Sequence, residues 1–182
     1  VAADETAARQ AAERMAADLA REYAAADPGL RVEVTACTAS ETPMDKASTE
    51  RAVCLLTCLP NGIQAMSMDI PGLVQTSLNL GVLTTTEDCL TATFCVRSSV
   101  GSQKTMLHRR LRALMAQLGG TAEISGDYPA WEYRPDSPLR DLMTEVFREQ
   151  YGREPQIEAI HAGVECGILA GKLPGLDCVS IG

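Results

Sequence analysis

Residues 73–99 read LVQTSLNLGVLTTTEDCLTATFCVRSS and carry the clearest secondary-structure signal in the sequence. In the second half of this stretch apolar residues alternate with polar or small ones, and the apolar members are Leu90, Ala92, Phe94 and Val96. A period of two predicts a strand with one face on a core. Apolar and β-branched residues come before it, and Glu87-Asp88 lies between the halves as a turn, so the stretch predicts an antiparallel hairpin. Its phase places Arg97 on the face opposite the apolar members.

The segments around this hairpin predict an α+β domain over residues 1–128. Apolar residues at helical spacing predict helices over residues 4–26, 46–59 and 102–118, with Asp4 and Ser102 as N-caps. Short β-type segments predict further strands over residues 30–36, 63–68 and 121–128. Each helix has one apolar stripe, so we expect an antiparallel sheet with the helices packed on one face.

The pattern changes after residue 128, where three prolines fall within ten residues. Beyond them the sequence predicts, in order, a helix over 137–151, a strand over 156–161, a helix over 165–172 and a strand over 176–181. This alternation is typical of an α/β sheet with parallel strands. Two strands and two helices are too few to complete such a sheet, so residues 129–182 predict an incomplete α/β segment.

Composition restricts the classes of partner. The chain has 182 residues and a net charge of −8, which argues against nucleic acid or an anionic membrane as the main partner. No run of about 18 apolar residues occurs, so no membrane span is expected. Residues 1–26 are charged throughout and do not resemble a signal peptide. We expect a cytoplasmic protein whose printed sequence begins in mid-structure.

Seven cysteines are present, at positions 37, 54, 58, 89, 95, 166 and 178. Their number is odd and their spacing matches no disulfide framework. We expect small buried thiols in a reducing compartment. Cys54 and Cys58 lie four apart on a predicted helix, which leaves a zinc or redox site as the alternative.

The segment with the most chemistry is residues 158–182, EAIHAGVECGILAGKLPGLDCVSIG. His161 ends a predicted strand, Gly163 lies in the turn, and Glu165 begins the next helix. Open α/β sheets bind ligands at the carboxyl ends of their strands, which favours a binding site at these residues. A glutamate in a first helical turn also interacts favourably with the helix dipole, so a purely structural role stays open.

This segment resembles the aminoacyl-histidine dipeptidases, the carnosinase-like Xaa-His dipeptidases of the M20 zinc peptidase family. The HAGVECGIL and LPGLDCVSIG runs carry most of the resemblance, and TSLNLGV at 76–82 and VRSS at 96–99 add to it. The resemblance covers nearly the whole chain. It implies that residues 1–128 are a lid domain of the dimerisation type without its first strand, and that residues 129–182 return to an incomplete catalytic α/β domain.

The resemblance also implies a zinc-dependent dipeptidase that hydrolyses Xaa-His dipeptides in its full-length form. The family's metal ligands and its catalytic glutamate match no position of this sequence. We therefore expect no catalytic and no metal-ligand residue here, no specific zinc binding, and no activity of this chain alone. A homodimer formed through the lid is a further implication.

Five residues are candidates for substrate binding: Arg97, Asn79, His161, Gly163 and Glu165. Arg97 offers a bidentate fork for a dipeptide's terminal carboxylate, or is a surface arginine at a strand end. Asn79 donates to substrate from the lid, or is a strand-edge asparagine. The other three line the cleft, with Glu165 facing a free amino terminus, or are scaffold.

Two further alternatives stay open. His108 lies off the apolar stripe of its predicted helix and is either a solvated surface residue or a group that reaches into a cleft. The chain as a whole is either the dipeptidase fragment or a non-catalytic α+β interaction and dimerisation module.

Overall fold

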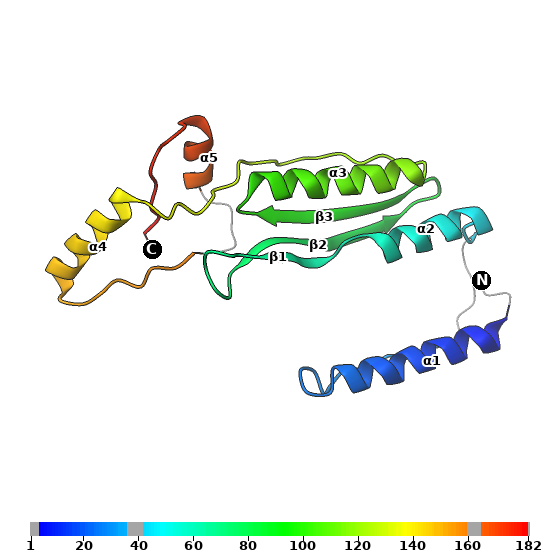
Figure 1. Ribbon diagram of the computed structural model, residues 1–182. Coiled ribbons are helices and arrows are strands. Elements are labelled where there is room, and N and C mark those ends of the chain that lie inside the picture. Colours follow the sequence, from blue (N-terminus) through cyan, green and yellow to red (C-terminus); the bar gives the residue numbers. More distant parts are fainter. Residues whose placement is uncertain (1–3, 36–41, 160–164, 182) are drawn as a thin grey trace. The chain divides into compact units, whose positions relative to one another are not determined.

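A computed structural model describes residues 4–35, 42–159 and 165–181. In these ranges it has five helices and a three-stranded antiparallel sheet, so the predicted α+β class is confirmed (Figure 1). The elements are α1 (Glu5–Glu22), α2 (Lys46–Cys58), β1 (Gly62–Met66), β2 (Val74–Thr85), β3 (Leu90–Ser98), α3 (Gly101–Gln117), α4 (Pro138–Tyr151) and α5 (Glu165–Lys172).

The chain divides into two compact units, Val1–Thr49 and Glu50–Gly182. This division separates compact bodies of the chain and does not test the lid and catalytic parts expected from the sequence. The boundary between residues 128 and 129 therefore stays a prediction.

The predicted hairpin is confirmed as β2 and β3. The two strands pair antiparallel, and β1 pairs with the other edge of β2, so the strand order is β1-β2-β3. The Thr86 amide donates to the Cys89 carbonyl across 2.8 Å and closes the turn around Glu87-Asp88. Leu80 pairs with Phe94 but Val82 pairs with Thr93, so one extra residue, Gly81, forms a bulge in β2.

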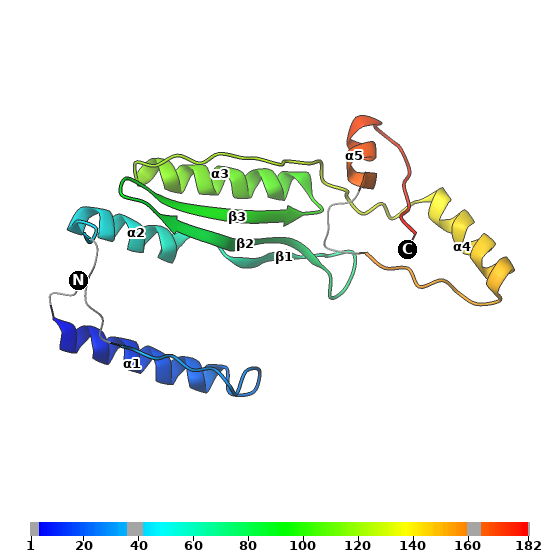
Figure 2. The ribbon, with the colours of Figure 1, turned by 180° about the vertical axis from the view of Figure 1, so that it is seen from behind.

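One face of the sheet is covered by α3 (Figures 1 and 2). Leu78 of β2 is 1% exposed and Leu107 of α3 is fully buried between the two layers. The Thr76 hydroxyl is also buried there and contacts the side chains of Ser98 and Gln103. Exposure alternates along all of β3, which confirms the predicted phase and leaves Arg97 on the uncovered face.

The start of α3 differs from the prediction. The helix begins at Gly101 and Val100 is its N-cap, so Ser102 does not cap it. Other oxygens bind the amides at this end of the helix: the Ser98 hydroxyl accepts from the Val100 amide at 3.1 Å, and the Glu132 carboxylate accepts from the Gly101 amide at 3.1 Å. An acceptor that is distant in sequence therefore caps the first turn.

In the first unit, Asp4 caps α1 as predicted, because its carboxylate accepts from the Ala7 amide at 3.0 Å. The strand predicted over residues 30–36 does not form in its described part. Residues 30–35 are extended without a backbone ladder, and the Arg9 guanidinium donates to the Val34 carbonyl at 3.3 Å. Residue 36 lies outside the described ranges.

The strand predicted over residues 121–128 is also wrong. This segment is extended but forms no ladder with β3. The Lys104 ammonium on α3 donates to the Asp127 carboxylate at 2.6 Å and to the Tyr128 carbonyl. A side chain of α3 thus binds the end of the segment, in place of the backbone of β3.

Near the C-terminus the helices are confirmed and the strands are not. Helices α4 and α5 match the predicted ranges within a residue, whereas residues 156–159 and 176–181 are irregular and residues 160–161 lie outside the described ranges. Parallel strands are stable when neighbouring strands and helices cover them. The described part of the chain offers these two segments no strand partner.

Helix α5 lies directly against residues 129–131. A side chain at Gly167 would place its Cβ 3.0 Å from the Pro129 carbonyl, and one at Gly171 would come within 2.7 Å of the Pro129 ring. Helix α4 is held to the C-terminal segment, since the Asp177 carboxylate accepts from the Ser137 hydroxyl at 2.8 Å and the Leu139 amide at 2.9 Å.

Candidate functional site

Asn79 and Arg97 lie on the sheet face opposite α3. Asn79 pairs with Cys95 and Ser77 pairs with Arg97, so Asn79 and Arg97 are diagonal neighbours on adjacent strands. Diagonal side chains on one face of an antiparallel pair are about 7–8 Å apart. Both residues are exposed. The structure therefore brings together two of the residues that the sequence suggested for substrate binding.

The surroundings of Arg97 keep it charged. Its pKa is raised above the ordinary value, first by a hydrogen bond to the Cys95 side chain and further by charge interactions with Cys95 and Tyr128. A guanidinium on an uncovered sheet face offers two parallel donors to a planar anion such as a carboxylate.

The other three candidates belong to the second part of the chain. His161 and Gly163 lie outside the described residues. Glu165 is the first residue of α5 and is exposed. The expected convergence of these residues on one cleft with Arg97 stays a prediction.

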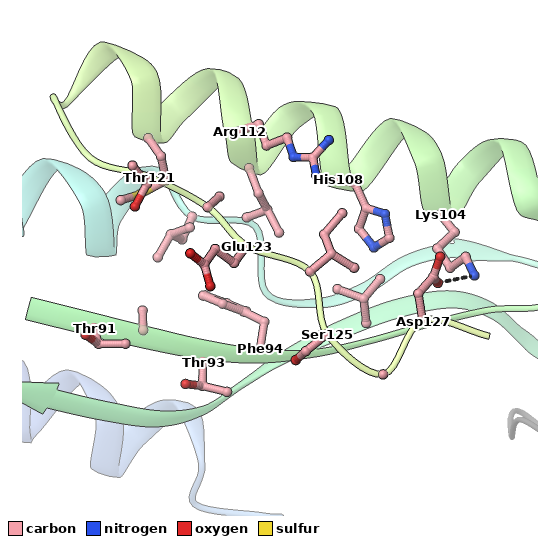
Figure 3. Close-up of a pocket in the computed structure, with 18 of the residues that line it drawn as sticks. Thr91, Thr93, Phe94, Lys104, His108, Arg112, Thr121, Glu123, Ser125 and Asp127 are labelled. Carbon is pink, nitrogen blue, oxygen red and sulfur yellow. Dashed lines mark hydrogen bonds and ion pairs between the residues drawn. The ribbon is translucent and has the colours of Figure 1, made fainter.

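A cavity of about 400 Å³ lies on the opposite face of the sheet, between α3, β3 and residues 121–128 (Figure 3). Leu55 of α2 and Leu59, which directly follows α2, line it together with Phe94 of β3 and Leu111 of α3. On one side the cavity is bounded by residues 121–128, where the predicted strand does not form.

Charged side chains follow one wall of this cavity. Lys104, His108 and Arg112 recur every fourth residue along α3, and Glu123 and Asp127 lie opposite them in the extended segment (Figure 3). His108 thus reaches the cavity, which is the second of its two interpretations. The spacing of four was visible in the sequence and could have indicated this charged face.

The ion pair at one end of the cavity is well formed. The Lys104 side chain is 14% exposed and the Asp127 side chain 54% exposed. The hydrogen bond from Lys104 lowers the pKa of Asp127, and the charges of Lys104 and His108 lower it further. The pair therefore fixes residues 127–128 to the first turn of α3.

The cysteines differ from the expectation of buried thiols. Cys54, Cys58, Cys89 and Cys95 are exposed, Cys166 and Cys178 are half-buried, and Cys37 lies outside the described residues. Helix α2 buries only Leu55, and Cys95 lies on the uncovered sheet face. The apolar character of the cysteine side chain therefore did not predict its burial at these positions.

Neither a zinc centre nor a membrane span fits the described residues. Over residues 4–35, 42–159 and 165–181, no three His, Cys, Asp or Glu side chains lie close enough together to hold a metal ion. A dinuclear zinc site requires several such donors. None of the described helices combines the length and the apolar character needed to cross a bilayer.

No family model matches this chain, but known proteins resemble it. The cytosol non-specific dipeptidase of Escherichia coli (strain K12) is 37% identical over 128 residues, which are 70% of this chain and 26% of that protein. The crystal structure of aminoacylhistidine dipeptidase from Vibrio alginolyticus matches with a TM-score of 0.76 and 30% identity. The resemblance to aminoacyl-histidine dipeptidases is confirmed.

The dipeptidase match covers most of this chain but a minor part of each relative. The structural match includes 87% of this chain and 32% of the aminoacylhistidine dipeptidase. The chain thus spans about a quarter of the curated relative and a third of the solved one. Both relatives are named as dipeptidases, which does not favour the interaction-module alternative.

Proposed function

We propose that this chain is one part of a zinc-dependent dipeptidase of the M20 family that hydrolyses Xaa-His dipeptides in the cytoplasm. The observation that carries this proposal is the match of 87% of the chain to an aminoacylhistidine dipeptidase of which it spans 32%. Residues 1–128 form the lid and residues 129–182 belong to the catalytic domain. The lid also supplies a homodimer contact.

The surface of the second part supports its place in a larger domain. Several large apolar side chains of this part are exposed, namely Leu142, Val146, Tyr151, Ile157, Leu173 and Ile181. Leu142 and Val146 lie one turn apart on α4 and so share one face of that helix, and an exposed apolar face supports a contact with other structure. The remaining catalytic domain of the full-length protein is the occupant that this proposal assigns.

The proposed task of this chain is to hold the dipeptide. Arg97 binds the terminal carboxylate through both guanidinium donors, and Asn79, on the same sheet face, donates a further hydrogen bond. His161, Gly163 and Glu165 line the other side of the cleft, where Glu165 faces the substrate's amino group. Zinc and its ligands come from outside this chain, so the chain alone is inactive and binds zinc only weakly and without specificity.

Kinetics of the full-length protein test the carboxylate role of Arg97. Arg97→Ala should lower kcat/KM on an Xaa-His dipeptide, because a charged pair in a closed cleft is lost. The corresponding loss of transition-state binding free energy should be roughly 2–4 kcal/mol. Arg97→Lys should recover only part of the loss, since an ammonium cannot form the fork. The same substitutions should change kcat/KM little on the dipeptide's C-terminal amide, which lacks the anion.

Arg110→Ala is a matched control, because Arg110 is exposed on α3, which packs on the other face of the sheet. This variant should leave kcat/KM unchanged on both the dipeptide and its C-terminal amide. Equal losses on the free acid and the amide in Arg97→Ala would reject a carboxylate contact. An unchanged rate on both would make Arg97 a surface residue.

A further inference from the structure

Two thiols project together from α2. Cys54 and Cys58 are one helical turn apart on α2 and both are exposed. Residues at this spacing are neighbours on a helix surface, with Cβ atoms about 5–6 Å apart. Only Leu55 of this helix is buried. The two thiols therefore form an accessible pair on a rigid element.

The side chains are also in contact. A hydrogen bond to Cys58 is the largest cause of a raised pKa at Cys54, and the charge of Cys58 adds to it. The Cys54 thiol is thus harder to ionise while Cys58 is near. A cation placed between them would remove this repulsion, because it favours both thiolates at once.

The number of donors selects the type of cation. Structural zinc takes four ligands, and no third His, Cys, Asp or Glu completes a metal-binding group within the described ranges. Soft thiolates favour copper(I), which a pair of sulfurs can hold in linear coordination. With metal–sulfur bonds on the order of 2.3 Å, a linear unit spans about 4.6 Å, which two thiols one turn apart can bridge.

We propose that Cys54 and Cys58 form a two-thiolate binding site for one copper(I) ion. Binding replaces the two S–H protons with two metal–sulfur bonds and releases both protons to solvent. Copper stays in the +1 state, so no oxidant or reductant takes part. The site is separate from the substrate-binding residues and does not depend on the dipeptidase proposal.

Anaerobic titration of the reduced chain with copper(I) tests this site, with bicinchoninate as a coloured competitor. The parent should withhold one more equivalent of copper from the competitor than Cys54→Ser does. Cys58→Ser should lose the same equivalent, and the double variant no more than either single one, because a linear site needs both sulfurs. Circular dichroism of each variant should show the parental helix content.

The double variant Cys89→Ser/Cys95→Ser is the matched control, since these thiols are also exposed but belong to the turn and β3. It should retain the full equivalent. A loss equal to that of Cys54→Ser would indicate general thiol binding and overturn the proposal. Unchanged copper retention in either single helix variant would also overturn it.

Proton release gives a second readout that scattered binding would not reproduce. In weak buffer near neutral pH, the parent should release about two more protons than Cys54→Ser during the first equivalent of copper. Binding should tighten from pH 6 to pH 8, since protons compete with the metal for thiolate. A pH-independent difference between parent and variant would contradict a two-thiolate site.

Discussion

The backbone of α5 at Gly171 packs closely against the Pro129 ring in the segment before α4. An added Cβ would lie 2.7 Å from two atoms of the proline ring, and a ring cannot move aside as a flexible side chain does. Gly171→Ala should therefore lower the free energy of unfolding by about 1–3 kcal/mol, as overpacking does. Urea unfolding gives this value. Gly101→Ala is the control, because its Cβ would meet nothing nearer than 3.8 Å.

The ion pair of Lys104 and Asp127 makes stability depend on pH. The pKa of Asp127 is lowered in the folded state, so the pair stabilises the fold above the ordinary aspartate pKa of about 3.9 and this contribution is lost as pH falls through the folded value. Asp127→Asn should cost less than about 1 kcal/mol at pH 7, since Asp127 is half exposed. Urea unfolding should show no difference from the parent near pH 2. A pH-independent loss would indicate packing instead.

At the scale of elements, Asp177 fixes the start of α4 from 38 residues away, through the Leu139 amide. This bond, followed by the one from Ser137, lowers the pKa of Asp177, so the cap is present above the ordinary aspartate pKa and is lost as pH falls through the lower folded value. Asp177→Ala should speed amide hydrogen exchange over residues 138–141 at pH 7. Glu145→Ala, in the exposed middle of α4, should not. Equal exchange in both variants would show that Ser137 alone caps the helix.

The helices were predictable because their signals are local. Asp4, the apolar stripes and the glycines at helix ends all lie within the segments they define. The hairpin was predictable for the same reason, since its two strands adjoin one turn. Composition predicted strands in three segments that form none, residues 30–35, 121–128 and 176–181. A strand requires a distant partner that composition does not reveal. Residues 121–128 are an example, because their end is bound to α3 by the Lys104 side chain and not to β3 by a backbone ladder.

The candidate site was predictable in part for a similar reason. Period-two alternation fixed the face of Arg97, and the pairing of β2 with β3 places Asn79 beside it. The cavity under α3 was missed, because it exists only where helix, sheet and extended segment meet. The exposure of Cys54 and Cys95 was missed since a small thiol fits equally well inside or outside.

At the scale of the whole molecule, the described residues do not hold the donors of a dinuclear zinc centre. The purified chain should therefore hydrolyse no Xaa-His dipeptide such as carnosine, with or without added zinc, whereas the proposed full-length dipeptidase should. Release of free histidine, followed by chromatography, measures this. Hydrolysis by the pure chain that a chelator abolishes would show that its own residues complete a metal site.

The bulge at Gly81 determines where the hairpin can change length. Leu80 and Val82 flank the surplus residue and already present opposite faces, so removing Gly81 joins them in ordinary alternation. Removing Ser77 instead would make Thr76 and Leu78 neighbours in sequence, so these two buried side chains could no longer both face α3. A one-residue deletion should thus be tolerated at position 81 and harmful at position 77. During divergence, single-residue gaps in this hairpin should gather at the bulge.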